Sequence, residues 1–141
     1  MVALEVSAHF PAPPADVWRV YTDHAGWTGW AGIGKVRLER EGTPERDGVG
    51  AVRAIENFGL VVREEVTHFE PPRLMRYRVA SGVPLRHHEG EVELLPDGDG
   101  TRLVWRCRFD VPIPGAGPFV RVGVAALFRL MLRRLARRRF R

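Results

Sequence analysis

Four polar side chains in the middle of the chain could do chemistry together: Arg53, Glu64, Tyr77 and His88. Each lies in a short segment of alternating apolar and polar residues, which is typical of a β-strand with one buried face. The alternation turns Glu64, Tyr77 and His88 toward the apolar face, whereas the segment around Arg53 does not decide its own side. If the four meet in an apolar pocket, burial and mutual charges would shift their pKa values.

Two kinds of site are compatible with these residues. In the catalytic hypothesis, Glu64 and His88 remove a proton from a carbon beside a ketone and return one to a leaving hydroxyl, as aldol cyclisation and dehydration require. Arg53 is then the third catalytic candidate. In the alternative, the same side chains only orient a ligand, or Arg53 and Glu64 form a structural ion pair while His88 lies at the cavity mouth. Pairing is expected in both cases, because a buried unpaired charge is strongly unfavourable.

Aromatic and apolar residues are the candidates for the walls of such a pocket. Trp27 and Trp30 could close a gate over a ligand, or belong to the core under two short helices. Trp105 shares the inward face of its strand and is either cavity wall or core. Leu127 and Met131, near the end of the chain, complete the predicted ligand-binding set.

Metal and nucleotide chemistry are not expected, and no cofactor is predicted. His87 and His88 are neighbours on a strand and so point to opposite faces. Cys107 is the only cysteine, and we interpret it as a small buried residue rather than a nucleophile. No phosphate-binding loop is present. His24 and His68 are expected at surfaces or strand ends.

A long apolar helix near the C-terminus should position these residues. Its start is marked by Gly115, Gly117 and Pro118. One face then carries apolar residues at steps of four, three, four and four, namely Val120, Val124, Leu127, Met131 and Leu135. The spacing predicts a helix over about residues 117–139. Its apolar arc is wide, so we expect the helix to be enclosed on most of its circumference.

The rest of the chain predicts the enclosing sheet. A strand over 2–10 is followed by two short helices, the first starting at Pro14 and the second within 24–30. Strand patterns with turn signals between them then cover 35–41, 49–57, 60–69, 74–80, 87–95 and 101–111. The fold class is therefore α+β: an antiparallel sheet of about seven strands curved around the long helix.

Three stretches of the sequence resemble a known superfamily. They are residues 11–18 with Asp23 and Trp27, residues 63–74, and residues 98–105. Together with the element order they resemble the START/SRPBCC superfamily and its helix-grip fold, in particular the polyketide cyclase/dehydrase and lipid transport branch. The resemblance implies a hydrophobic cavity between sheet and helix for a lipid-like, aromatic or polyketide-like molecule. The Cys and His spacing of the Rieske branch is absent, which excludes the redox function of that branch.

Composition limits the remaining possibilities. The 141 residues, 45% hydrophobic and 28% charged, predict a single domain over residues 1–141. The N-terminus shows no secretion signal and no apolar run is long enough to span a membrane, so a cytoplasmic location is expected.

The net charge of +5 is concentrated at the basic end of the helix, residues 133–141. Its arginines are Arg133, Arg134, Arg137, Arg138, Arg139 and Arg141. They could meet an anionic membrane or simply form a solvated helix end, which the helix dipole favours. Nucleic acid is not expected as a partner, because the body offers no basic groove or stacking platform.

Three functional hypotheses follow. The first is a carrier that binds a small hydrophobic ligand. The second is a cyclase/dehydratase that uses the same cavity. The third is a membrane-surface or partner-binding protein that works through the arginine-rich end.

Overall fold

The structure is a computed structural model of the chain and describes residues 1–57 and 59–139. It contains one seven-stranded sheet, two short helices after the first strand, and a long C-terminal helix, which confirms the predicted fold. The elements in chain order are β1 (Val2–Phe10), α1 (Pro14–Thr22), the 3₁₀ turn η1 (His24–Gly26), α2 (Trp27–Trp30), β2 (Lys35–Arg40), β3 (Val52–Asn57), β4 (Leu60–Glu70), β5 (Leu74–Ser81), β6 (Arg86–Asp97), β7 (Gly100–Asp110) and α3 (Gly117–Arg139).

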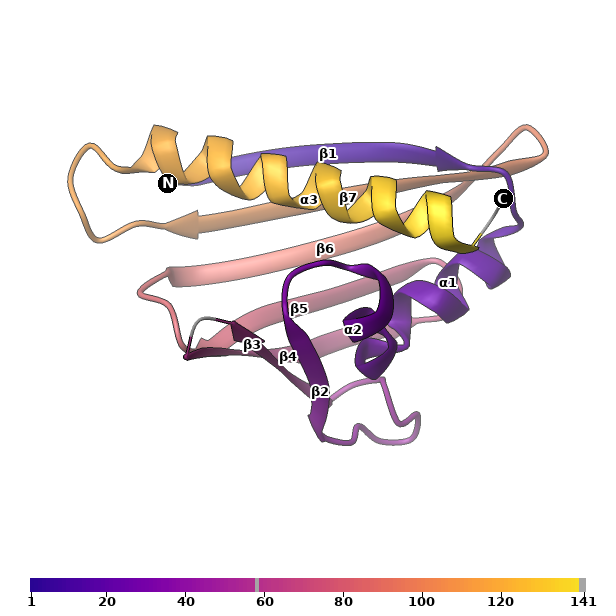
Figure 1. Cartoon of the computed structure of the whole chain (residues 1–141), viewed down its shortest axis with the longest axis horizontal. Helices are drawn as coiled ribbons and strands as arrows, with labels where there is room; N and C mark the ends of the chain where they lie inside the picture. Colours follow the sequence, from indigo (N-terminus) through magenta and orange to yellow (C-terminus); the bar gives the residue numbers. More distant parts are fainter. Residues whose placement is uncertain (58, 140–141) are drawn as a thin grey trace.

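The sheet is antiparallel throughout, in the order β1-β7-β6-β5-β4-β3-β2. Strands β2 to β7 follow one another as a meander, and β1 then pairs with β7. Figure 1 shows α3 lying along β1 and β7, with α1 near the C-terminal end of α3 and α2 near β2. Because neighbouring strands pair along the sheet, the side chains on one face of a strand contact those on the same face of the next strand.

The inner side of α3 packs on the sheet through residues three and four apart. Phe128, Met131, Leu132 and Leu135 are all buried. The ring of Phe128 stacks on Trp105 of β7, with centroids 3.8 Å apart and planes 7° from parallel. This contact holds the helix over the β1–β7 part of the sheet.

The expected enclosure of α3 on most of its circumference is wrong. The exposed fractions are 81% for Phe119, 65% for Val122 and 47% for Leu130. Leu127, predicted on the buried face, is 40% exposed and lies at the edge of that face. The reason is that the sheet covers one side of the helix and no described element covers the opposite side (Figure 1).

His24 is fully buried, so the prediction of a surface position is also wrong. It lies in η1 with Nδ1 3.1 Å from Asp47 Oδ1, and its ring meets the edge of Trp27. Burial lowers the pKa of His24 despite this carboxylate. Asp47 belongs to the connection between β2 and β3, a contact that no local pattern around His24 indicates.

The stack between α3 and the sheet can be tested by Phe128→Ala. Deleting a buried aromatic ring should lower the free energy of unfolding by about 3–5 kcal/mol, through lost transfer energy and the cavity left behind. Leu130→Ala on the exposed side of the same helix is the matched control and should change it by less than about 0.5 kcal/mol. Urea titration measures both. Equal effects of the two substitutions would contradict the described orientation of α3.

Candidate functional site

A cavity of about 340 Å³ lies between the inner face of the sheet and α3. It is lined mostly by apolar side chains from five strands, two connections and the helix. The lining residues are Gly32, Ile33, Ile55, Asn57, Val62, Glu64, Val79, Val83, Leu85, His88, Cys107, Phe109, Val124, Leu127 and Phe128. Its few polar groups therefore decide which ligand chemistry it accepts.

A buried ion pair stands at one wall of the cavity. Arg53 and Glu64 are opposite one another on β3 and β4, and Arg53 Nε donates to Glu64 Oε1 at 2.7 Å. Arg53 is 1% exposed, whereas the Glu64 side chain is 14% exposed and lines the cavity. Burial opposes the charge of Arg53, but Glu64 together with Tyr21 and Tyr77 outweighs it, and the pKa of Arg53 is raised.

Two aromatic rings hold the guanidinium of Arg53. Its central carbon lies 4.3 Å from the ring centre of Trp27 and 4.4 Å from that of Tyr77. Its two terminal nitrogens make no hydrogen bond to the part of the chain that the structure describes. The π faces therefore replace hydrogen-bond partners as the environment of the charge.

Gly90 makes room for one of these rings. It pairs with Tyr77 across β5 and β6, and a Cβ at position 90 would lie 2.2 Å from the Tyr77 ring. The Tyr77 hydroxyl accepts a hydrogen bond from Trp105 Nε1 at 2.7 Å. Burial and the charge of Glu64 raise the pKa of Tyr77 well above its ordinary value, so the hydroxyl stays protonated.

His88 is held in one tautomer by its neighbours. The β6–β7 register shifts between Arg86 and Glu89, and His87 has a positive φ of 54°. At this irregularity His88 Nδ1 accepts a hydrogen bond from the backbone N–H of Val79 at 3.0 Å. Nδ1 is therefore unprotonated, and the Nε2–H of the neutral ring points to Cys107 Sγ at 3.3 Å. Burial lowers the pKa of His88.

Cys107 is buried at the same point of the cavity wall. Burial, aided by the negative charge of Glu64, raises the pKa of its thiol to about 12. The reactive thiolate is therefore scarce near neutral pH, which fits the interpretation of Cys107 as a small buried residue.

The arrangement suits binding better than proton transfer. A general base needs an available lone pair, and the only one on neutral His88 accepts the Val79 N–H. Glu64 Oε1 is bonded to Arg53, while its Oε2 has no hydrogen-bond partner in residues 1–57 and 59–139. One carboxylate oxygen thus remains to receive a donor from a ligand.

The predicted site residues separate into three layers. Glu64, His88 and Leu127 line the cavity together, and Arg53 and Tyr77 lie behind Glu64. Trp27, Trp30, Trp105 and Met131 are buried core residues that do not line it. Apolar walls of the cavity that were not predicted come from Val62, Val79, Leu85 and Phe109. Alternation predicts which face of the sheet some of these residues take. It does not predict which part of a strand lies over a cavity.

Another hollow, of about 520 Å³, lies along β1, β6 and β7 and reaches Arg121 at the start of α3. Its walls are largely charged side chains that already pair with one another, such as Arg106 with Glu91 and Arg108 with Glu89. An apolar ligand would gain little there. In the same described residues, no three His, Cys, Asp or Glu side chains gather as a metal site would require, and no helix is long and apolar enough to cross a membrane.

The fold and cavity define a START-like, helix-grip protein, and the comparisons agree. Residues 1–139 match the family described as polyketide cyclase/dehydrase and lipid transport. The chain therefore belongs to this family of the START/SRPBCC superfamily, and membership suggests binding of a hydrophobic ligand. No curated protein sequence matches the chain.

Solved structures share the fold at low sequence identity. A protein from Thermobifida fusca superposes with a TM-score of 0.79 at 22% identity, covering 96% of this chain and 91% of that one. XoxI from Bacillus cereus superposes with a TM-score of 0.80 at 16% identity, covering 99% of this chain and 96% of that one. A START superfamily protein from Mycobacterium smegmatis superposes with a TM-score of 0.78 at 16% identity, covering 97% of this chain and 96% of that one. At this identity the likeness shows the fold alone.

The Arg53–Glu64 pair can be tested by Glu64→Gln. Removing the carboxylate leaves a buried charge without its partner, so the free energy of unfolding should fall by about 3–5 kcal/mol. Glu65→Gln on the next residue is the matched control: Glu65 pairs with the more exposed Arg40 and Arg78, and its loss should cost about 1 kcal/mol or less. Denaturant titration measures both. A Glu64→Gln effect no larger than the control would contradict the structural importance of the pair.

The buried neutral state of His88 predicts a pH dependence of stability. Its pKa is lowered in the folded protein, so below about pH 6.5 the unfolded chain binds a proton that the folded chain does not. Stability should fall as the pH decreases from neutrality toward about pH 5. In His88→Asn, the amide oxygen can still accept the Val79 N–H without titrating, so the decrease should be smaller. Identical pH profiles would contradict the lowered pKa of His88 in the folded protein.

Proposed function

We propose that the protein binds one small apolar molecule carrying a hydroxyl group, and holds it without transforming it. The observation that carries this proposal is an apolar cavity in which Glu64 presents one oxygen free of hydrogen bonds while Arg53 holds the other. The volume of about 340 Å³ is near the lower end of small-molecule sites, roughly 300–1,000 Å³. The ligand is therefore of modest size.

The charge of Glu64 supports a preference for a neutral ligand. A carboxylate oxygen accepts a hydrogen bond from a hydroxyl group, whereas an acidic ligand would bring a second negative charge into an apolar space. Arg53 cannot offset that charge by direct contact, because it lies behind Glu64 and does not line the cavity. A fatty alcohol, a phenol or a similar hydroxylated molecule fits this chemistry.

The cyclase/dehydratase hypothesis receives less support from the same geometry. His88 uses its lone pair on Val79, and the thiol of Cys107 has its pKa raised to about 12. The hydroxyl of Tyr77 is buried and bonded to Trp105. No second group in the cavity is therefore poised to return a proton that Glu64 would remove.

Ligand preference can be measured with decanol and decanoate as competitors of phenylnaphthylamine, a neutral fluorescent probe. Decanol should displace the probe at least about tenfold more effectively than decanoate at neutral pH, a difference of roughly 1.4 kcal/mol. Glu64→Gln should narrow this difference, because the repelling charge is gone. Equal displacement by both compounds would contradict the role given to Glu64.

The location of the ligand can be tested on α3. Val124→Trp introduces a large ring at the cavity wall, whereas Val122→Trp places the same ring on the exposed side of the helix. The first substitution should weaken probe binding by more than about tenfold, and the second should leave it unchanged. Native mass spectrometry of the purified protein should then show a releasable mass in the wild type that Val124→Trp lacks. Binding that survives both substitutions would overturn the cavity as the site.

A further inference from the structure

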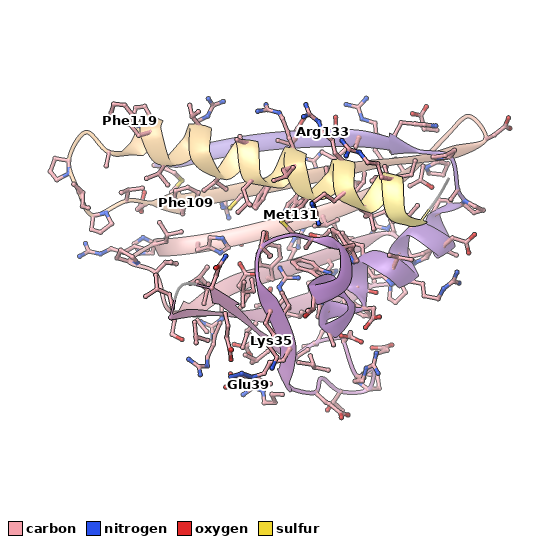
Figure 2. All side chains as sticks on the ribbon, in the orientation of Figure 1. Lys35, Glu39, Phe109, Phe119, Met131 and Arg133 are labelled. Carbon is pink, nitrogen blue, oxygen red and sulfur yellow. The ribbon has the colours of Figure 1, made fainter. Side chains whose placement is uncertain are left out.

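The side of α3 turned away from the sheet is apolar toward its N-terminal end and basic toward its C-terminal end. It exposes Phe119 and Val122 in the first two turns and Leu130 just past the middle of the helix. Its C-terminal part exposes Arg133 and Arg137, with Arg129 beside the junction. Figure 2 shows Phe119 and Arg133 on one side of the helix and Met131 on the other. These six exposed residues are called the outward stripe below.

The arginines of the outward stripe have no acidic partners. Helix α3 contains no Asp or Glu, and none of Arg129, Arg133 and Arg137 makes an ion pair with the residues that the structure describes. The sheet is different: Arg106 alone contacts Glu5, Glu91 and Glu93. The outward stripe therefore combines uncovered apolar surface with uncompensated positive charge.

The other arginines of the basic end do not all share this position. Arg134 donates from Nε to the backbone oxygen of Trp30 at 2.8 Å and so ties α3 to α2. Arg138 and Arg139 belong to α3, but their side chains are outside the described part, as is Arg141 entirely. Arg129, Arg133 and Arg137 are therefore the arginines of the outward stripe.

We propose that the outward stripe docks on a lipid bilayer that contains anionic lipids. A helix lying in the membrane interface buries an apolar face at the boundary of headgroups and acyl chains while basic residues meet the phosphates. Phe119, Val122 and Leu130 supply the apolar contact. Arg129, Arg133 and Arg137 supply the charge, and their long stems let the guanidinium groups reach the headgroups.

The combination of features favours a membrane over other occupants. A second copy of the chain would bring two rows of unpaired arginines together, which is unfavourable. Nucleic acid could bind the arginines, but it would gain little from Phe119 and Leu130, because these exposed side chains form no flat platform on which bases could stack. A bilayer offers both an apolar interior and a negative surface.

Docking by this helix would also place the candidate ligand near the membrane. Val124, Leu127 and Phe128 of the same helix line the cavity on its inner side. A ligand that leaves past the half-exposed Leu127 would thus emerge beside the outward stripe. Docking does not depend on the proposed ligand binding, because the two use opposite sides of α3.

Sedimentation with vesicles tests the charged part. The wild type should bind vesicles of equimolar phosphatidylcholine and phosphatidylglycerol, bind phosphatidylcholine alone far less, and weaken as salt is added. Arg133→Ser/Arg137→Ser should reduce binding by about 25-fold, roughly fivefold for each arginine. The control Arg86→Ser/Arg102→Ser removes the same charge from exposed positions outside α3, and should reduce binding much less. Equal losses in the two double variants, or no wild-type binding, would overturn the proposal.

Insertion of the apolar part needs its own readout. All four native tryptophans are buried, so Phe119→Trp introduces an exposed one whose emission should shift to shorter wavelength with anionic vesicles only. Phe119→Ser/Leu130→Ser should weaken sedimentation although the charge is unchanged. Val124→Trp, which tests the cavity, should leave sedimentation unchanged, so failure of docking and failure of ligand binding are distinguishable. Self-association without vesicles that Phe119→Ser/Leu130→Ser abolishes would assign the stripe to a second copy and overturn the proposal.

Discussion

The guanidinium of Arg53 lies in the core, where an unpaired charge would be strongly unfavourable, and several parts of the fold serve to keep it there. Glu64 supplies the opposite charge from the neighbouring strand. The rings of Trp27 and Tyr77 both lie against the group. The absence of a side chain at Gly90 lets the Tyr77 ring occupy its place. A helix, three strands and a specific glycine are therefore coordinated around one charge.

The same contacts continue across the inner face of the sheet to the long helix. The Tyr77 hydroxyl accepts from Trp105, and Trp105 stacks on Phe128 of α3. This row of side chains links α2, β3, β5, β7 and α3, which are distant in sequence. The cavity lies beside this row, so its polar wall is anchored to rigid elements on both sides. Such anchoring suits a site that orients a ligand, because packing and hydrogen bonds hold the polar group in one position.

Helix α3 performs two tasks with two sides. Its inner side closes the cavity and packs on the sheet, while its outer side leaves apolar and basic residues in contact with solvent. The wide apolar arc that the sequence shows is therefore two separate apolar surfaces. A helix with an apolar arc of this width can be enclosed on all sides, or it can have one buried and one exposed apolar surface. The spacing of its apolar residues is the same in both cases.

The sequence by itself determined the order and approximate limits of the elements, because alternation, helical spacing and turn residues are local properties of the chain. It also placed Glu64, Tyr77 and His88 on the inner face, since strand periodicity decides which side a residue takes. Only the tertiary structure decided that Arg53 joins them, that His24 is buried against Asp47, and that the lone pair of His88 is used by Val79. It also decided that Trp27 and Trp30 are core residues and that Leu127 lies at the cavity edge. These outcomes depend on contacts between distant segments and on a register shift at His87, and local periodicity carries no information about either.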